Sequence, residues 1–517
     1  MTATSIPFQA VYPGERLFLD YVAGAASARQ LFTGDPASLW RPGYSPRRPP
    51  VGADLSRSLA TYNRRIGADA LALSNVNALA ESSTLCVITG QQVCLLGGPV
   101  YSLYKIATAV QVARELASRL NRTVVPVFWL ASEDHDFHEA NSTAAVGSDG
   151  EVHHVAFGWK EQGRSVSDLP VDEAVMGAVE RYFDLLGASP DGELRERFRP
   201  RGGLYSEWVA GLWARLFAGT GLVVLEPWLL RPFAEEFFTA AIEQRGLIAT
   251  ALERSAARLQ AAGYPPALEP QRAGRLFTYD KAGLRVRLEG APAGRIEPTR
   301  LSPDASLRPL LADSLLPTVA TVLGPGEVAY QAMLQPLYSI MQIQQPVIYP
   351  RKSFTAVSDQ DVSQLAAANA SVGEVLKGTL IVPQLLAGLS RPEELSPYDR
   401  TLEKLGQAFA PLRDLVAPLD PNLTRTWERS LAHARLSVRR LQQRAQRAQL
   451  AGRGHRPQQL QRIRNTLRPR NRLQERLLPA PHFLAAFGSR FVAIAIDTGE
   501  VGVFEHLVLQ LPPGGSQ

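Results

Sequence analysis

The pattern of apolar and polar residues predicts a strand–helix–strand unit early in the chain. Leu85–Thr89 and Thr123–Leu130 are apolar runs of strand length, and Val100–Leu120 between them has helical periodicity. Two strands joined in this way pair in parallel through a right-handed crossover, and their sheet is buried on both faces. We therefore expect an α/β core.

Later apolar runs predict that the sheet resumes after two interruptions. Gly221–Glu226, Val319–Leu323 and Val347–Tyr349 have the length and composition of further buried strands. The residues between them mix short strands with helices, so they are interpreted as insertions. The elements expected there are a strand at Val152–Phe157, a helix near Asp172–Leu186, a helix from about Phe233 to Ala261, and a hairpin of Leu276–Tyr279 with Leu284–Leu288.

The periodicity becomes purely helical from about Pro397. Apolar residues recur with spacings of four and three in two stripes, Tyr398–Leu412 and Trp427–Ala448, on either side of a turn at Pro418–Asn422. This pattern predicts an antiparallel helical hairpin or coiled coil. Pro411 weakens the first helix locally, because proline removes a helix hydrogen bond.

The excess positive charge of the chain is concentrated in one segment. Residues 425–476 hold fifteen arginines and two acids, so this segment carries +13 and leaves −7 for the rest of a chain of net charge +6. A basic helical segment is typical of a solvated face, or of contact with acidic groups, a nucleotide or nucleic acid. Few aromatic residues interleave with the arginines, so we expect no nucleic-acid partner.

Targeting signals are not evident. No apolar run reaches the ~20 residues that span a bilayer, and Met1–Pro13 does not read as a signal peptide. Cys86 and Cys94 are the two cysteines, too few for a disulfide framework in 517 residues. We therefore expect a cytoplasmic protein with no membrane partner.

A glycine-rich segment follows the first strand and leads into a helix. Glycines let a ligand approach the backbone closely, and a helix N-terminus favours phosphate or carboxylate. The segment lacks the P-loop and G-x-G-x-x-G patterns, so packing of helix on strand is the plain alternative. The binding residues expected here are Thr89, Gly90, Gln91, Gln92, Gly98, Tyr101, Tyr104 and Lys105.

An ionisable run, Glu133–Glu139, directly follows the second strand. Carboxylates beside a histidine can act as a general base, hold Mg²⁺ or bind an ammonium group, whereas a solvated acidic turn is the plain alternative. Because the strand neighbours the first one, the run should open onto the same crevice. The spacing of His135 and His138 gives no zinc signature, and we predict no protein-held metal. The catalytic candidates are Glu133, Asp134, His135 and Asp136.

A third motif repeats the turn from a strand into a glycine-rich segment after Val319–Leu323. Glu327 could bind an amine or sugar hydroxyl, or merely cap a helix, and arginines nearby could pair with carboxylate or phosphate. The binding candidates added here are Arg308, Gly324, Gly326, Glu327, Tyr330 and Arg351.

These motifs together resemble the BshC family, the cysteine-adding enzymes of bacillithiol biosynthesis. The residues that carry the resemblance are Thr89–Gln92, Gly97–Lys105, Pro126–Phe137, Leu307–Pro309, Leu323–Tyr330, Tyr349–Arg351 and Leu473–Arg476. Two residues depart from the family pattern, since Cys94 stands where a small residue is expected and His138 where an acid is common.

The resemblance implies a ligase that condenses the carboxyl group of L-cysteine with the amine of glucosaminyl-malate. ATP is the implied source of energy, with Mg²⁺ as a further cofactor, because amide formation needs an activated carboxylate. A base among Glu133–Asp136 would deprotonate the attacking amine. Two alternatives stay open: a nucleotidyltransferase acting on another acceptor, and a nucleic-acid- or protein-binding protein built on the Arg-rich coiled coil.

The resemblance also implies a Rossmann-like parallel-sheet core with two inserted connecting domains and a C-terminal α-helical coiled coil that forms a homodimer. The expected segments are 1–140 (core, first part), 141–220 (first insertion), 221–232 (core strand), 233–316 (second insertion), 317–385 (core, last part), 386–480 (coiled coil) and 481–517 (C-terminal segment).

Overall fold

The computed structural model describes residues 1–134, 137–159, 163–187, 192–290, 294–378, 388–452 and 457–514. A five-stranded sheet in the order β11-β10-β2-β3-β6 forms the core, and all four strand pairs are parallel. This confirms the predicted α/β class. The strands are β2 (Leu85–Gln92), β3 (Val124–Ala131), β6 (Val223–Leu225), β10 (Thr318–Leu323) and β11 (Val347–Pro350).

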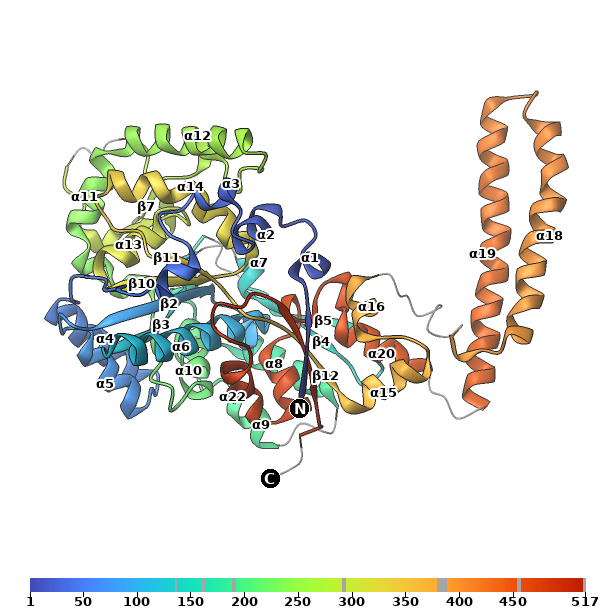
Figure 1. Ribbon diagram of the computed structural model, residues 1–517, viewed down its shortest axis with the longest axis horizontal. Coiled ribbons are helices and arrows are strands. Elements are labelled where there is room, and N and C mark those ends of the chain that lie inside the picture. The colour runs from blue at the N-terminus through green and yellow to red at the C-terminus, as the bar shows by residue number, and fades with distance from the viewer. Residues whose placement is uncertain are drawn as a thin grey trace.

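Helices cover both faces of this sheet (Figure 1). The crossover helix α6 (Tyr101–Leu120) lies on one face with α4 (Ala53–Arg65), whereas α13 (Arg308–Leu315) and α14 (Pro325–Ile340) lie on the other. β3 is buried along its whole length. The near-continuous apolar runs seen in the sequence follow from this two-sided burial.

The insertions contain the short elements that the sequence predicts. β4 (Ser142–Val146) and β5 (Val152–Ala156) form an antiparallel pair, followed by α8 (Glu173–Leu186). β7 (Leu276–Tyr279) pairs antiparallel with β8 (Arg285–Arg287). The long helix expected over Phe233–Ala261 is instead two helices, α11 (Glu235–Glu243) and α12 (Arg245–Ala261), because Gln244 has non-helical dihedral angles.

A second sheet joins the two ends of the chain. β13 (His506–Leu511) pairs antiparallel with β1 (Thr2–Ile6) and parallel with β12 (Ser353–Ser358). Local sequence patterns do not predict this sheet, because its pairings join residues about 150 to 500 positions apart.

The helical region is a hairpin that projects from the α/β body (Figure 1). α18 (Pro392–Val416) continues through Pro411, and the Trp427 indole of α19 (Pro421–Gly452) donates a hydrogen bond to the Phe409 carbonyl at 2.7 Å. α20 (Pro457–Leu467) lies back on the body, against α16 (Val372–Lys377). Within the described ranges, no helix combines the length and apolar character that crossing a membrane requires.

Candidate active site

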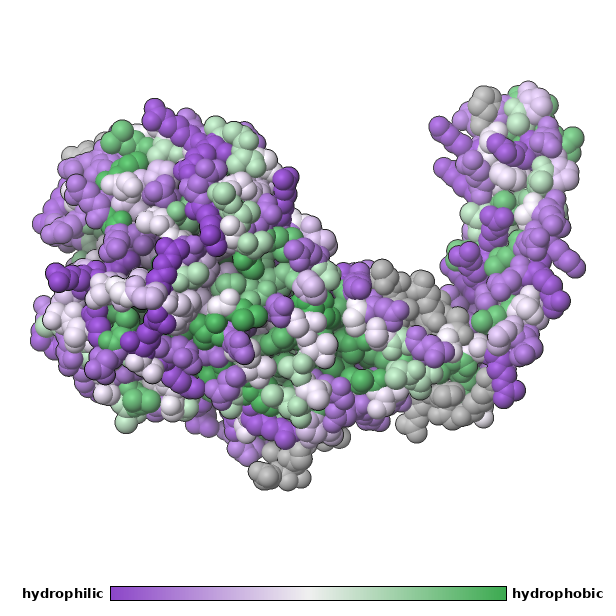
Figure 2. Space-filling model, in the orientation of Figure 1, coloured by the Kyte–Doolittle hydropathy of each residue, from purple (hydrophilic) through white to green (hydrophobic). Residues whose placement is uncertain are grey.

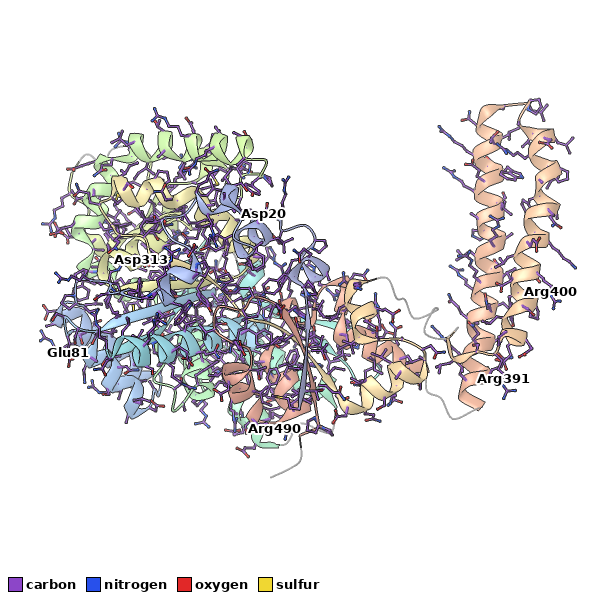
Figure 3. All side chains as sticks on the ribbon, in the orientation of Figure 1. Asp20, Glu81, Asp313, Arg391, Arg400 and Arg490 are labelled. Carbon is purple, nitrogen blue, oxygen red and sulfur yellow. The ribbon has the colours of Figure 1, made fainter. Side chains whose placement is uncertain are left out.

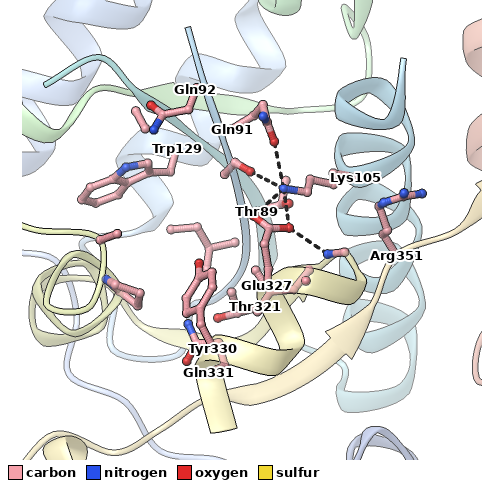
Figure 4. Close-up of a pocket in the computed structure, with 18 of the residues that line it drawn as sticks. Thr89, Gln91, Gln92, Lys105, Trp129, Thr321, Glu327, Tyr330, Gln331 and Arg351 are labelled. Carbon is pink, nitrogen blue, oxygen red and sulfur yellow. Dashed lines mark hydrogen bonds and ion pairs between the residues drawn. The ribbon is translucent and has the colours of Figure 1, made fainter. Parts of the chain in front are cut away.

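A cavity of about 380 Å³ opens where β2 and β10 end, between the sheet and helices α13 and α14 (Figure 4). It brings together twelve of the binding residues predicted from the sequence. They are Thr89, Gly90, Gln91, Gln92, Tyr101, Lys105, Arg308, Gly324, Gly326, Glu327, Tyr330 and Arg351.

Lys105 of α6 contacts residues of β2 and α14 in the lining of this cavity. Its buried ammonium group donates to the Gly90 carbonyl at 2.8 Å, to Gln91 Oε1 at 3.0 Å and to the Glu327 carboxylate at 2.6 Å (Figure 4). Burial lowers the pKa of Lys105, and the charge of Glu327 partly offsets this effect. An ammonium group has three donors, so Lys105 positions Gln91 and Glu327 besides supplying positive charge.

Asp134, which follows the neighbouring strand, does not itself line the cavity but contacts two residues that do. Its Oδ2 accepts a hydrogen bond from Gln92 Nε2 at 3.0 Å and lies 3.7 Å from Arg308 Nη2. The register of the parallel strands β2 and β3 places Gln92 opposite Ala131, three residues before Asp134. The glutamine-bearing turn and the acidic run therefore share one site, as the strand order requires.

Glu133 lies elsewhere, which argues against it as the general base. Its side chain is fully buried, forms an ion pair with Arg231 and accepts a hydrogen bond from Ser302 Oγ at 3.0 Å. A carboxylate held by an arginine and shielded from the cavity cannot receive a proton from a substrate there. The candidates His135 and Asp136 lie outside the described residues.

The N-terminus of α14 forms one wall of the cavity. Glu327 Oε2 accepts a hydrogen bond from the Gly324 backbone N–H at 2.8 Å, so Glu327 caps the helix and also faces the cavity. Its side chain is 29% exposed, which leaves the carboxylate open to a ligand. The helix-capping interpretation of Glu327 is confirmed, whereas its binding of an amine or a sugar hydroxyl stays a prediction.

Arg351 is held in place by a buried network. Its guanidinium donates to the two Glu475 carboxylate oxygens at 2.7 and 3.2 Å, and Glu475 also accepts from Tyr12 and Ser353. Burial alone would lower the pKa of Arg351, but the Glu475 carboxylate outweighs burial and raises it. Ser353 in turn contacts His506 Nδ1 at 2.7 Å, so the terminal sheet supports the cavity arginine.

Two predicted binding residues do not line the cavity. Tyr104 is fully buried and packs edge-on against Phe354, with ring centroids 4.9 Å apart. Gly98 has a positive φ of 75°, and an added Cβ would lie 2.9 Å from the Cβ of Cys94. Gly98 therefore shapes the loop rather than the cavity.

The cysteines do not act as nucleophiles. Both side chains are buried, and burial raises the pKa of each thiol to about 12. At neutral pH a thiol with such a pKa is almost entirely protonated, whereas the thiolate is the reactive species.

Several cavity residues were not predicted. Some of them, such as Glu139 and Arg476, lie in motifs that the sequence shows, but others belong to no motif with a chemical signature. Trp129 lies inside an apolar strand, Thr321 within β10, and Asp313 and Gln331 on helices. The lining residues absent from the predicted set are Ile88, Trp129, Ala131, Glu139, Ala305, Pro309, Ala312, Asp313, Thr321, Leu323, Pro325, Gln331 and Arg476.

The chain is similar to known proteins over most of its length. The family model described as Bacillithiol biosynthesis BshC, N-terminal Rossmann-like domain, matches residues 1–297 and 292–352, and the model of the C-terminal coiled-coil domain matches residues 393–511. A relative from Koribacter versatilis, named "Putative cysteine ligase BshC", is 31% identical over 540 residues that cover 99% of this chain and 100% of the relative. Relatives of the same name from Geobacillus kaustophilus and Geobacillus thermodenitrificans are 30% and 29% identical, covering 99% and 92% of this chain and 100% and 94% of their own.

Proposed function

Because this chain belongs to the BshC family of bacillithiol-biosynthesis ligases, we propose that it joins the carboxyl group of L-cysteine to the amine of glucosaminyl-malate, driven by ATP. The observation that carries this proposal is the cavity lined by Gln92, Lys105 and Glu327, with Asp134 hydrogen-bonded to Gln92 at its margin. Cations and carboxylates side by side suit a reaction between a phosphate-activated acid and an amine.

The proposed reaction has two steps, activation of the cysteine carboxylate and formation of the amide. A cysteine carboxylate oxygen attacks a phosphorus atom of ATP, which releases pyrophosphate and leaves an adenylate, or releases ADP and leaves an acyl phosphate. The glucosaminyl nitrogen then attacks the activated carbonyl carbon, the amide forms, and AMP or phosphate leaves. The amine gives up a proton to a base.

Four cations line the cavity and would stabilise phosphate charge. Lys105 and Arg351 are buried and paired with Glu327 and Glu475, whereas the Arg476 side chain is 42% exposed and lies 3.8 Å from Glu15. Arg308 completes the set. The N-terminus of α14 adds backbone N–H donors and the positive end of its dipole. Positive side chains beside a helix N-terminus suit the binding of a nucleoside triphosphate.

Mg²⁺ is the expected companion of ATP. In the described part of the chain, no three histidine, cysteine, aspartate or glutamate side chains gather as a metal site. Mg²⁺ is usually held by one or two carboxylates together with substrate phosphates, whose charge it neutralises. Asp134 and Glu327 are the carboxylates that could supply this contact.

Asp134 is the general base that the described geometry favours. Its side chain is 27% exposed beside the cavity, and Gln92 and Arg308 hold it in place. We expect Asp134→Asn to lower kcat by about 10²–10⁴-fold, because the amide cannot accept the proton of the amine. The steady-state rate of bacillithiol formation measures this change in kcat. Asp168→Asn changes a nearby exposed aspartate and should leave kcat unchanged, and equal activity of both variants would exclude Asp134 as the base.

Reconstitution tests the proposed reaction. Purified protein is incubated with L-cysteine, glucosaminyl-malate, ATP and Mg²⁺, and the product thiol and released nucleotide are quantified. Bacillithiol formed with one AMP per turnover indicates an adenylate, and one ADP indicates an acyl phosphate. Absence of bacillithiol under all nucleotides would reject the proposal.

The projecting hairpin is the proposed dimer contact. Leu415 and Leu441 are 67% and 61% exposed, and Figure 2 shows apolar atoms scattered among hydrophilic ones along this element. Covering them with the hairpin of a second copy would remove apolar surface from water.

We therefore expect Leu415→Glu/Leu441→Glu to convert a dimer into a monomer, measured by light scattering during gel filtration. Leu71→Glu changes a leucine of the body that is 48% exposed, and it should leave the mass unchanged. A double variant that remains dimeric would place the contact elsewhere.

A further inference from the structure

The cavity lining includes three buried side chains with acceptor atoms that have no partner among the described residues. We call these three residues, Asp313, Thr321 and Gln331, the inner end. These side chains are 6%, 9% and 1% exposed. Asp313 Oδ1, Thr321 Oγ1 and Gln331 Oε1 have no hydrogen-bond partner among the described residues. An unsatisfied buried polar atom is destabilising, so three of them along one cavity point to a ligand that satisfies them.

The chemistry of the inner end favours a cation that donates hydrogen bonds. Asp313, marked within the α/β body in Figure 3, accepts a hydrogen bond from the Tyr338 hydroxyl on Oδ2 at 2.7 Å. Arg48 is the cation that acts on Asp313, and its charge works against burial by lowering the pKa of the carboxyl. Burial raises the pKa of Asp313 to about 6, so the carboxylate is largely ionised at neutral pH. Burial of a carboxylate is costly unless hydrogen bonds and a close counter-ion satisfy it, and an ammonium group at Asp313 Oδ1 would offset that cost.

We propose that the inner end binds the ammonium group of L-cysteine, with Asp313 as its counter-ion. This inference rests on the proposed ligase function and identifies which substrate lies deepest. Both Arg308 and Asp313 line the cavity, and they are five positions apart on α13, or about 7.5 Å along the helix. An amino acid with its ammonium at Asp313 would direct its carboxylate toward Arg308, whose buried Nε has no partner among the described residues.

The second substrate also carries an amine, but its chemistry does not suit this place. The glucosaminyl amine must lose a proton to attack, and a nearby carboxylate favours the charged ammonium form. For cysteine the same effect is useful, because a protonated amine cannot attack the activated carboxyl group of another cysteine. Asp313 thus positions cysteine and keeps its amine unreactive.

The test compares L-cysteine with 3-mercaptopropionate, which has the same carboxyl and thiol groups but no amine. We expect Asp313→Asn to raise KM for L-cysteine by about tenfold to a hundredfold, to leave KM for glucosaminyl-malate within about twofold, and to lower the preference for cysteine over 3-mercaptopropionate by at least about tenfold. Tyr338→Phe removes only the hydroxyl that donates to Asp313, and it should retain the preference.

An unchanged preference in an active Asp313→Asn enzyme would overturn the inference alone, as would a rise confined to KM for glucosaminyl-malate. A wild-type enzyme that forms no amide would overturn the proposed function and this inference with it. Calorimetry on the wild-type protein makes the test independent of any variant. L-cysteine should bind at least about tenfold more tightly than 3-mercaptopropionate, and equal affinity would overturn the inference.

Discussion

Replacing Lys105 with methionine is expected to lower kcat/KM for bacillithiol formation by about 10²–10³-fold, the range found when one pre-organised donor is removed from an active site. The ammonium group touches Gly90, Gln91 and Glu327 at once. Its loss therefore removes a charge from the cavity and also releases two side chains that it positions. Steady-state kinetics with varied ATP and varied cysteine measures the effect.

The fold should survive this change. The Glu327 carboxylate left behind is 29% exposed and can take up water, so the penalty for an unpaired buried charge is small. Thermal unfolding of Lys105→Met should stay close to that of the wild type. Lys281→Ala changes an exposed lysine in the β7–β8 turn. It should change neither kcat/KM nor the temperature of thermal unfolding. A fully active Lys105→Met enzyme would remove this lysine from the catalytic machinery.

Glu475→Gln should destabilise the α/β body by about 3–5 kcal/mol, which is the typical cost of breaking a buried ion pair from one side. Glu475 is fully buried and Arg351 is 4% exposed. The variant keeps the size of the side chain but leaves the guanidinium charge without its partner. The midpoint of urea unfolding, followed by circular dichroism, reports the loss.

Two further variants test whether the lost stability comes from the unpaired charge of Arg351. Glu15→Gln removes an acid that lies 3.8 Å from the half-exposed Arg476, and an exposed pair of this kind is worth at most about 1 kcal/mol. Arg351→Met with Glu475→Leu removes both buried charges, so it should recover part of the stability lost in Glu475→Gln. An unchanged midpoint in Glu475→Gln would show that the pair does not support the fold.

Local sequence patterns predicted the sheet and much of the cavity because both depend on short-range rules. The apolar runs that became β2 and β3 fix two adjacent parallel strands, and their carboxyl ends meet at one edge. That reasoning placed Asp134 beside Gln92. It could not separate Asp134 from Glu133, because the direction in which each side chain leaves the strand end depends on Arg231 and Ser302, far away in the sequence.

Other features depend on tertiary contacts that no window of sequence contains. Asp313 is a single acid on a short helix, and its interest arises only from burial beside β10 and α14. Glu475 belongs to a motif that the resemblance uses, yet its partner Arg351 lies 124 residues earlier. The two apolar stripes predicted the helical hairpin, but they did not predict that α20 packs against the α/β body.

The pairing of β13 with both β1 and β12 has a consequence for biosynthesis on the ribosome. Chains emerge from the N-terminus, so β1, β12 and Arg351 are made before Glu475 and His506 exist. Until then the nascent polypeptide exposes strand edges and lacks the counter-ion of its cavity arginine, a state prone to aggregation. The candidate site is therefore completed only after β13 has been synthesised, and chaperone capture before that point would protect the nascent polypeptide.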